Sequence, residues 1–127
     1  MTQEDKELLL KDLCARLPYG VIVATPKGRG HVCDINFTIF GYELGVNINP
    51  IIRDTFSIND VKPYLFPLSS MTDEQSKIYH ELIKGMFGTS ALINFEVLTD
   101  FFNANHFDYR GLIKKGLAID ATGLNIY

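Results

Sequence analysis

The sequence lacks the features that mark several large classes of protein. It has 127 residues, no tryptophan and only two cysteines, Cys14 and Cys33, which form no CxxC pair. A disulfide framework needs more cysteines, so we expect both thiols to be reduced, small and buried. No run approaches the roughly 18 apolar residues that cross a bilayer. Residues 1–7 are acidic and polar, unlike a secretory signal. We therefore expect a cytoplasmic protein with no membrane partner.

An excess of positive charge is also missing. Twelve Lys and Arg residues stand against 15 Asp and Glu, a formal net charge of −3. Modules that bind duplex nucleic acid usually carry a basic excess, so duplex binding is not expected. It would require four cations to share one face: Arg16, Lys27, Arg29 and Lys62. The ordinary apolar (46%) and charged (21%) fractions instead indicate one globular domain over residues 1–127.

Recognisable catalytic signatures are absent as well. The three histidines, His31, His80 and His106, are not at helical metal-ligand spacing from one another. Neither a GxxxxGK[ST] phosphate loop nor a GxSxG serine elbow occurs. We therefore expect no metal and no cofactor. Ser69 and Ser70 are expected to cap a following helix rather than to act as nucleophiles.

Residues 1–60 predict a helix followed by a small antiparallel sheet. Thr2 and Asp5 have capping-box spacing, and the helix should end at Pro18. Residues 20–25 are β-branched and predict a strand, followed by a five-residue Gly/Pro loop at 26–30. Further strands are expected at 31–40, 42–48 and 55–58, with a break at Pro50. The helical face should carry Leu10, Leu13, Cys14 and Leu17, and period two in 31–40 places His31, Cys33, Ile35, Phe37 and Ile39 on one face.

Residues 61–127 predict a helical part and a tail. The two prolines within 62–68 indicate a linker that packs against the sheet. A helix should begin at Ser70 or Thr72 and run to about Lys84 before Gly85 and Gly88. A third helix is expected over 90–103, and the tail, 106–127, should fold back on the body. Inward side chains of the third helix should be Leu92, Phe95, Leu98, Phe101 and Phe102. The fold class is α+β: an N-terminal helix, an antiparallel β-meander or partly open barrel, and a helical C-terminal half.

The densest polar cluster is Asn105–Gly111. His106, Asp108 and Arg110 alternate, so an extended chain would project them to one side. Asp108 would then orient the imidazole, and Arg110 would hold a phosphate or carboxylate. The alternative is a helix-terminating loop in which Asp108 pairs with Arg110 or caps a turn, and His106 caps the preceding helix. We favour this structural interpretation, because such ion-pair loops are common.

The second candidate is Lys27–His31, a glycine loop with two cations. Its backbone N–H groups and charge suit an anion, whereas the simpler interpretation is a solvated hairpin tip. The nine Phe and six Tyr can stack a base or line an interface, but most should fill the core. If the protein captures an anion, the candidate ligand-binding residues are Lys27, Arg29, Asn105, His106, Tyr109 and Arg110.

Three blocks carry a resemblance to a known family. They are DLCARLPYGV at 12–21, DVKPYLFPLSSMT at 60–72 and NHFDYRGLI at 105–113, the last followed by Gly116-Leu117-Ala118. Together they resemble short proteins carried by gut Bacteroidales and their phages, with Phe66 standing where that family commonly has arginine. The resemblance implies no activity, cofactor or catalytic residue. It implies a phage or prophage setting, in which small acidic proteins often act by binding.

Two functional hypotheses follow. The leading one is a non-enzymatic binding module, forming a homo-oligomer, that recognises a host or virion protein or a small anionic ligand such as a nucleotide. The alternative is a small hydrolase or nuclease-like enzyme. In it His106 is the general base, Asp108 its orienting partner and Arg110 the charge stabiliser. That enzyme requires an accessible His106 imidazole in a concavity.

Overall fold

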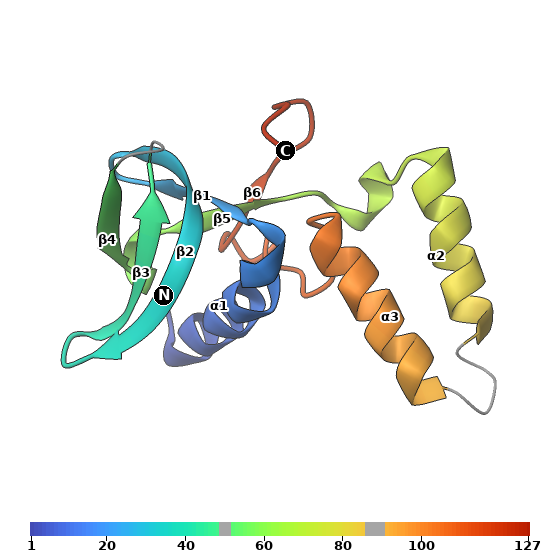
Figure 1. The fold of residues 1–127 in the computed structure, drawn as a ribbon, viewed down its shortest axis with the longest axis horizontal. Helices are drawn as coiled ribbons and strands as arrows, with labels where there is room; N and C mark the ends of the chain where they lie inside the picture. The colour runs from blue at the N-terminus through green and yellow to red at the C-terminus, as the bar shows by residue number, and fades with distance from the viewer. Residues whose placement is uncertain (49–51, 86–90) are drawn as a thin grey trace.

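The computed structural model describes residues 1–48, 52–85 and 91–127. It has a six-stranded sheet with one helix against it and a pair of helices beside it (Figure 1). The expected break at Pro50, the helix end at Gly88 and the helix start at residue 90 lie outside the described residues. In chain order the longer elements are α1 (Gln3–Arg16), β1 (Ile22–Thr25), β2 (Gly28–Thr38), β3 (Gly41–Asn47), β4 (Arg53–Ser57), β5 (Lys62–Leu65), α2 (Asp73–Gly85), α3 (Ala91–Ala104) and β6 (Ile119–Asp120).

The sheet is open and mostly antiparallel. Its strand order is β4-β3-β2-β1-β5-β6, and only the β5–β6 pair is parallel. Strands β1 to β4 form the expected meander, and the fold is α+β as the sequence predicts. Because β4 and β6 remain as free edges, the barrel alternative is not adopted.

The segment at 62–68 is not a linker but contains a central strand. Residues Lys62–Leu65 form β5, which pairs with β1 through Pro63 opposite Val23. A residue before proline is driven to an extended conformation, so the prolines favour a strand here rather than break one. The buried Tyr64 and Leu65 side chains then hold β5 in the sheet.

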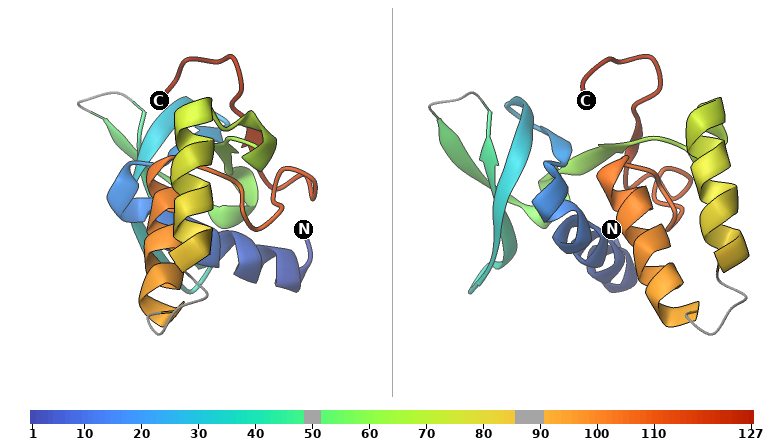
Figure 2. Two further views of the ribbon diagram at one scale, coloured as in Figure 1. Left: turned by 90° about the vertical axis from the view of Figure 1, so that its right-hand side faces the viewer. Right: turned by 45° about the vertical axis from the view of Figure 1, so that its right-hand side comes forward.

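Helix α1 covers one face of the sheet (Figure 2). The capping box of Thr2 and Asp5 is confirmed. The expected apolar face is wrong, because the buried side chains are Leu9, Asp12, Leu13 and Arg16. The stripe predicted from apolar residues is displaced by about one residue from the buried one. The prediction left out charged side chains, which can be buried where they have partners inside the fold.

Both cysteines are exposed, which corrects the expectation that they are buried. Cys14 lies beside the true buried stripe of α1, facing solvent. Strand β2 has a register shift between Val32 and Asp34, and Val32 rather than Cys33 points into the core. Ile35, beyond the shift, packs against the same core as Val32, so the predicted single face of alternate residues from His31 to Ile39 does not hold.

The turn between β1 and β2 is shorter than expected. Only Pro26 and Lys27 lie between the strands, and Gly28–Gly30 are part of β2. At Gly30 the neighbouring strand approaches closely, and an added Cβ would lie 2.7 Å from Val46 Cγ1. Glycine is therefore required at this position by packing rather than by a turn.

The second helix begins with a capping box at Thr72. Thr72 Oγ1 accepts from the Gln75 amide at 3.2 Å, and Gln75 Oε1 accepts from the Thr72 amide at 2.9 Å. Ser69 and Ser70 do not cap this helix. They lie in a short 3₁₀ turn, Leu68–Ser70, where Ser70 Oγ donates to the Pro67 carbonyl.

Helix α3 buries Leu98 and Phe102, as expected, and partly buries Phe101, but Phe95 is 57% exposed. The burial of Leu92 lies outside the described side chains. Among the helices of the described ranges, none is long and apolar enough to cross a bilayer.

The tail folds back on the body, as predicted. Its strand β6 pairs with β5, and the Tyr127 hydroxyl donates to the Tyr64 carbonyl at 2.7 Å. The same oxygen accepts from the Ile22 amide at 2.9 Å. Burial raises the pKa of Tyr127 to about 12, so this hydroxyl stays protonated as a donor. The tail thereby covers part of the sheet face opposite α1.

Candidate functional site

The Asn105–Gly111 segment completes a buried arginine cluster with α1. Arg16, fully buried, donates from Nε to Asp12 Oδ2 at 2.8 Å and from Nη2 to the Phe107 carbonyl at 2.5 Å. Arg110 Nε lies 3.2 Å from Asp12 Oδ1, within ion-pair range but not aligned as a hydrogen bond. The Tyr109 ring contacts both guanidiniums, with Arg16 Cζ at 5.4 Å and Arg110 Cζ at 4.7 Å from its centroid. One carboxylate therefore serves two arginines in the interior.

The Asp108 side chain caps a turn and does not orient the His106 imidazole. Its two carboxylate oxygens accept from the Leu112 and Ile113 amides at 2.8 and 2.9 Å. Capping of a turn, one of the structural alternatives, is what the structure contains. Pairing of Asp108 with Arg110 is not, because Arg110 approaches Asp12 instead.

His106 lies under the C-terminal tail. Its ring stacks on Tyr127 with centroids 3.6 Å apart, and its Nδ1 atom is buried without a hydrogen-bond partner. Burial, then the charges of Arg16 and His31, lower its pKa to about 4, so the imidazole is neutral near pH 7. It does not meet the condition for the hydrolase alternative, which is an accessible base in a concavity. Nor does any hydrogen bond within the described ranges join His106 to Asp108.

Asn105 stabilises the end of α3. Its Nδ2 donates to the Phe101 carbonyl at 2.9 Å, and its Oδ1 accepts from Gln75 Nε2 at 3.4 Å. The side chain borders a hollow of about 190 Å³ between the first turn of α2 and the loop that follows α3. Its polar groups are therefore already engaged within the fold.

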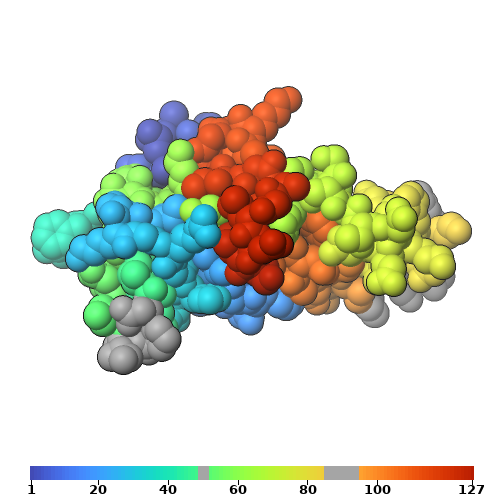
Figure 3. Space-filling model, turned by 90° about the horizontal axis from the view of Figure 1, so that it is seen from above, coloured from blue at the N-terminus to red at the C-terminus, as the bar shows by residue number. Residues whose placement is uncertain are grey.

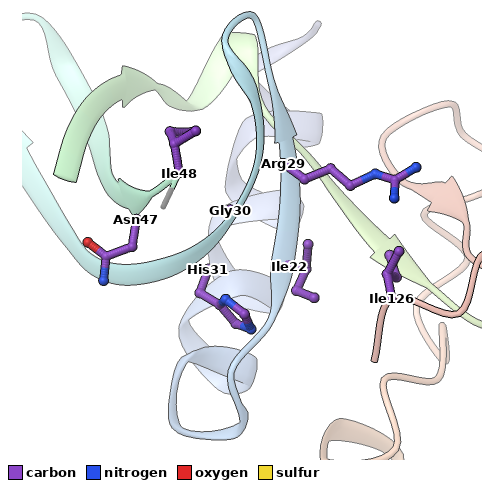
Figure 4. Close-up of a pocket in the computed structure, with 7 residues that line it drawn as sticks. All are labelled: Ile22, Arg29, Gly30, His31, Asn47, Ile48 and Ile126. Carbon is purple, nitrogen blue, oxygen red and sulfur yellow. The ribbon is translucent and has the colours of Figure 1, made fainter. Parts of the chain in front are cut away.

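A larger hollow lies on the sheet face opposite α1 (Figure 4). We call it the β2 hollow; its volume is about 540 Å³. His31 stands opposite Ile22 in β1 and opposite Asn47 in β3, so these three side chains share one face. Arg29 is two residues before His31 and projects to that face as well. The lining residues are Ile22, Arg29, Gly30, His31, Asn47, Ile48 and Ile126.

Arg29 is the cation of the β2 hollow, and Tyr64 holds it in place. Arg29 Nε donates to Tyr64 Oη at 3.3 Å, and its Cζ lies 5.2 Å from the Tyr64 ring centroid. No carboxylate among residues 1–48, 52–85 and 91–127 pairs with Arg29. Over the same ranges Tyr64 Oη is its one hydrogen-bond acceptor, and neither Nη group has one.

The two cations of the predicted glycine loop separate in the fold. Lys27 pairs with Asp54 at 2.5 Å, which lowers the Asp54 pKa, and it does not line the β2 hollow. On the same sheet Arg53 binds Asp34, with Nε 2.9 Å from Oδ2. Arg29 thus differs from both of these neighbouring cations in having no acidic partner.

The condition for duplex binding is not met. It required Arg16, Lys27, Arg29 and Lys62 on one face, and Arg16 is fully buried. The structure also separates the predicted ligand-binding residues. Arg29 lines the β2 hollow, and Lys27 pairs with Asp54. Tyr109 and Arg110 belong to the arginine cluster, whereas Asn105 contacts Phe101 and Gln75 and His106 stacks on Tyr127.

Sequence reasoning missed part of the β2 hollow. The spacing of Arg29 and His31 contains the signal, provided that Gly28–Gly30 are assigned to a strand. No local pattern points to Asn47 or Ile126, which arrive from β3 and from the tail. Within the described ranges no group of three potential metal ligands occurs.

Comparison with known proteins does not assign a role to the site. No family model, no curated protein and no solved structure matches this chain.

Proposed function

We propose that this protein is a non-enzymatic binding module whose β2 hollow takes a small anion with an apolar or aromatic body, such as a mononucleotide. The observation that supports the proposal is Arg29. Its guanidinium is oriented by Tyr64, lacks an acidic partner in the described part of the chain, and borders a hollow of about 540 Å³. That volume falls in the range of about 300–1,000 Å³ typical of small-ligand sites.

Each lining side chain has a role in this proposal. The two free Nη groups of Arg29 form a fork that suits a carboxylate or phosphate. His31 and Asn47 supply further polar contacts from adjacent strands, in the same row across the sheet. Ile22 and Ile126 form an apolar wall against which a planar or aliphatic body can pack.

The proposed function does not involve turnover. The groups near the hollow include no nucleophile with an adjacent base, and His106 is engaged under Tyr127. A small acidic binder also fits the phage setting implied by the resemblance of the three sequence blocks, although the proposal does not depend on it.

Isothermal titration calorimetry tests the proposal with four probes: AMP, GMP, CMP and inorganic phosphate. We expect a mononucleotide to bind more tightly than phosphate alone, because only the nucleotide fills the apolar wall. Arg29→Gln should weaken that binding about 10- to 150-fold, since a hydrogen bond to a charged group contributes about 1.5–3 kcal/mol. Circular dichroism establishes that the variant is folded.

Lys27→Gln is the matched control, because Lys27 is a neighbouring exposed cation outside the hollow. It should change the affinity by no more than about 3-fold. If none of the probes binds, or if Lys27→Gln weakens binding as much as Arg29→Gln, the small-anion site is refuted. A protein partner would then be the remaining ligand class for a binding module.

A further inference from the structure

The hairpin formed by β2 and β3 ends in an exposed apolar tip. Phe37, Ile39 and Phe40 are 74%, 94% and 82% exposed, and together they define what we call the β2–β3 tip. The Phe37 ring packs against Tyr42 on the opposite strand, with ring centroids 4.9 Å apart. The tip projects from the sheet at one end of the molecule (Figure 1). Exposed apolar side chains grouped in this way usually mark an interaction site.

An apolar groove lies at the opposite end of the molecule, between α2 and α3. It has a volume of about 540 Å³, and none of the described residues that line it is charged. Figure 3 shows the β2–β3 tip in cyan at one end and α2 in yellow at the other. Six apolar and aromatic side chains form most of its wall, and we call them the α2–α3 groove: Leu68, Tyr79, Ile83, Phe95, Leu98 and Phe102.

The tip and the groove match in size and in chemistry. A cavity of about 150 Å³ accepts one benzene, so a groove of about 540 Å³ has room for roughly three such groups. The tip offers two phenyl rings and one branched aliphatic side chain. The three tip side chains and the six named groove side chains are uncharged, so burying them removes no charged group from water.

We propose that the β2–β3 tip of one copy of this chain docks into the α2–α3 groove of a second copy. Two different surfaces at opposite ends give a head-to-tail contact, which leaves one tip and one groove free in every dimer. Such a contact therefore continues into a ring or a filament rather than stopping at two chains. This inference is independent of the β2 hollow.

The contact is small, so association depends on concentration. Each buried aromatic side chain removes about 150–250 Å² from water, and the three tip side chains remove roughly 500 Å². With the matching groove area the total approaches about 1,000 Å², the lower end for a specific interface. We expect dissociation constants of about 10 µM to 1 mM for a contact of this size.

Sedimentation velocity over a concentration series tests the proposal. The weight-average mass of the wild type should rise above 14.3 kDa as the concentration increases to about 1 mM. The tip variant Ile39→Ser/Phe40→Ser and the groove variant Phe95→Ser should each remain monomeric. All three side chains are more than half exposed, so these changes leave the core intact. Val97→Ser is the control on α3, since Val97 is exposed but does not line the groove.

Mixing the two variants gives the decisive result. The tip variant retains its groove and the groove variant retains its tip, so the mixture should form dimers and nothing larger. A monomeric wild type at about 1 mM would overturn the proposal. So would variants that associate like the wild type, or a mixture that fails to dimerise. If Phe95→Ser proves unfolded by circular dichroism, Leu68→Ser serves as the groove variant, because Leu68 is also exposed.

Discussion

Replacing Asp12 by asparagine should destabilise the protein more than any conservative change on its surface. The Asp12 carboxylate is fully buried, 2.8 Å from Arg16 Nε and 3.2 Å from Arg110 Nε. Asparagine keeps the shape of the side chain but removes the one carboxylate charge that pairs with the two guanidiniums among the described residues. Arg16 would then be a buried cation without a paired carboxylate, in contact with the Phe107 carbonyl and the Tyr109 ring.

The expected magnitude follows from that geometry. Removing one partner of a buried ion pair costs about 3–5 kcal/mol, and Asp12→Asn belongs at the upper end because two cations lose their partner. Arg110→Gln should cost only about 1 kcal/mol, because Arg110 is partly exposed and Asp12 keeps its bond to Arg16. A domain of this length has a total free energy of unfolding of about 6–19 kcal/mol, so Asp12→Asn removes a large fraction of it.

Equilibrium unfolding in urea, followed by far-UV circular dichroism, measures the effect. With a slope of about 2 kcal/mol per molar urea, the midpoint of Asp12→Asn should fall by about 2 M. Asp100→Asn, at an exposed position on α3, is the matched control and should change stability by less than about 0.5 kcal/mol. If the two variants unfold at the same urea concentration, or if Arg110→Gln costs as much as Asp12→Asn, the reasoning about the shared carboxylate is refuted.

Two further predictions concern His106 and Gly30. Because the pKa of His106 is lowered from 6.5 to about 4, the unfolded chain takes up a proton that the folded chain excludes. The free energy of unfolding should therefore fall by up to about 3 kcal/mol as the pH decreases from about 6.5 to about 4. In urea titrations across this range His106→Asn, which tolerates the positive φ of this residue, should flatten the slope. The control His80→Asn, at an exposed site, should keep the wild-type slope of unfolding free energy against pH. If His106→Asn also keeps that slope, the assignment of the pH dependence to His106 is contradicted. Gly30→Ala should cost about 1–3 kcal/mol, because its Cβ would press against β3 near Val46. Gly45→Ala should cost less, because the flexible Arg53 side chain can move away; equal thermal midpoints of the two variants would show that the approach at Gly30 is not limiting.

Local signals in the sequence determined much of the secondary structure. The capping boxes at Thr2 and Thr72 mark helix starts that the structure confirms, because a side chain and an amide three residues apart need no distant partner. The β-branched residues and the alternation of side chains with a period of two also predicted strands of the meander. The return of the tail onto the body was predicted as well, and the structure adds its anchors, β6 and Tyr127.

Only the tertiary structure decided which side chains are buried and which residues form the candidate site. Arginine side chains are mostly exposed in folded proteins. Arg16 is nevertheless buried, because Asp12 and the Phe107 carbonyl, 91 residues away, stabilise it inside the fold. Strand β5 lies between β1 and β6 in the sheet, a pairing that the linker prediction for residues 62–68 did not include. The β2 hollow combines Arg29 with Asn47 and Ile126 from other parts of the chain. Short-range patterns record the preferences of a segment, whereas burial, charge pairing and cavities depend on contacts between distant segments, which no local spacing encodes.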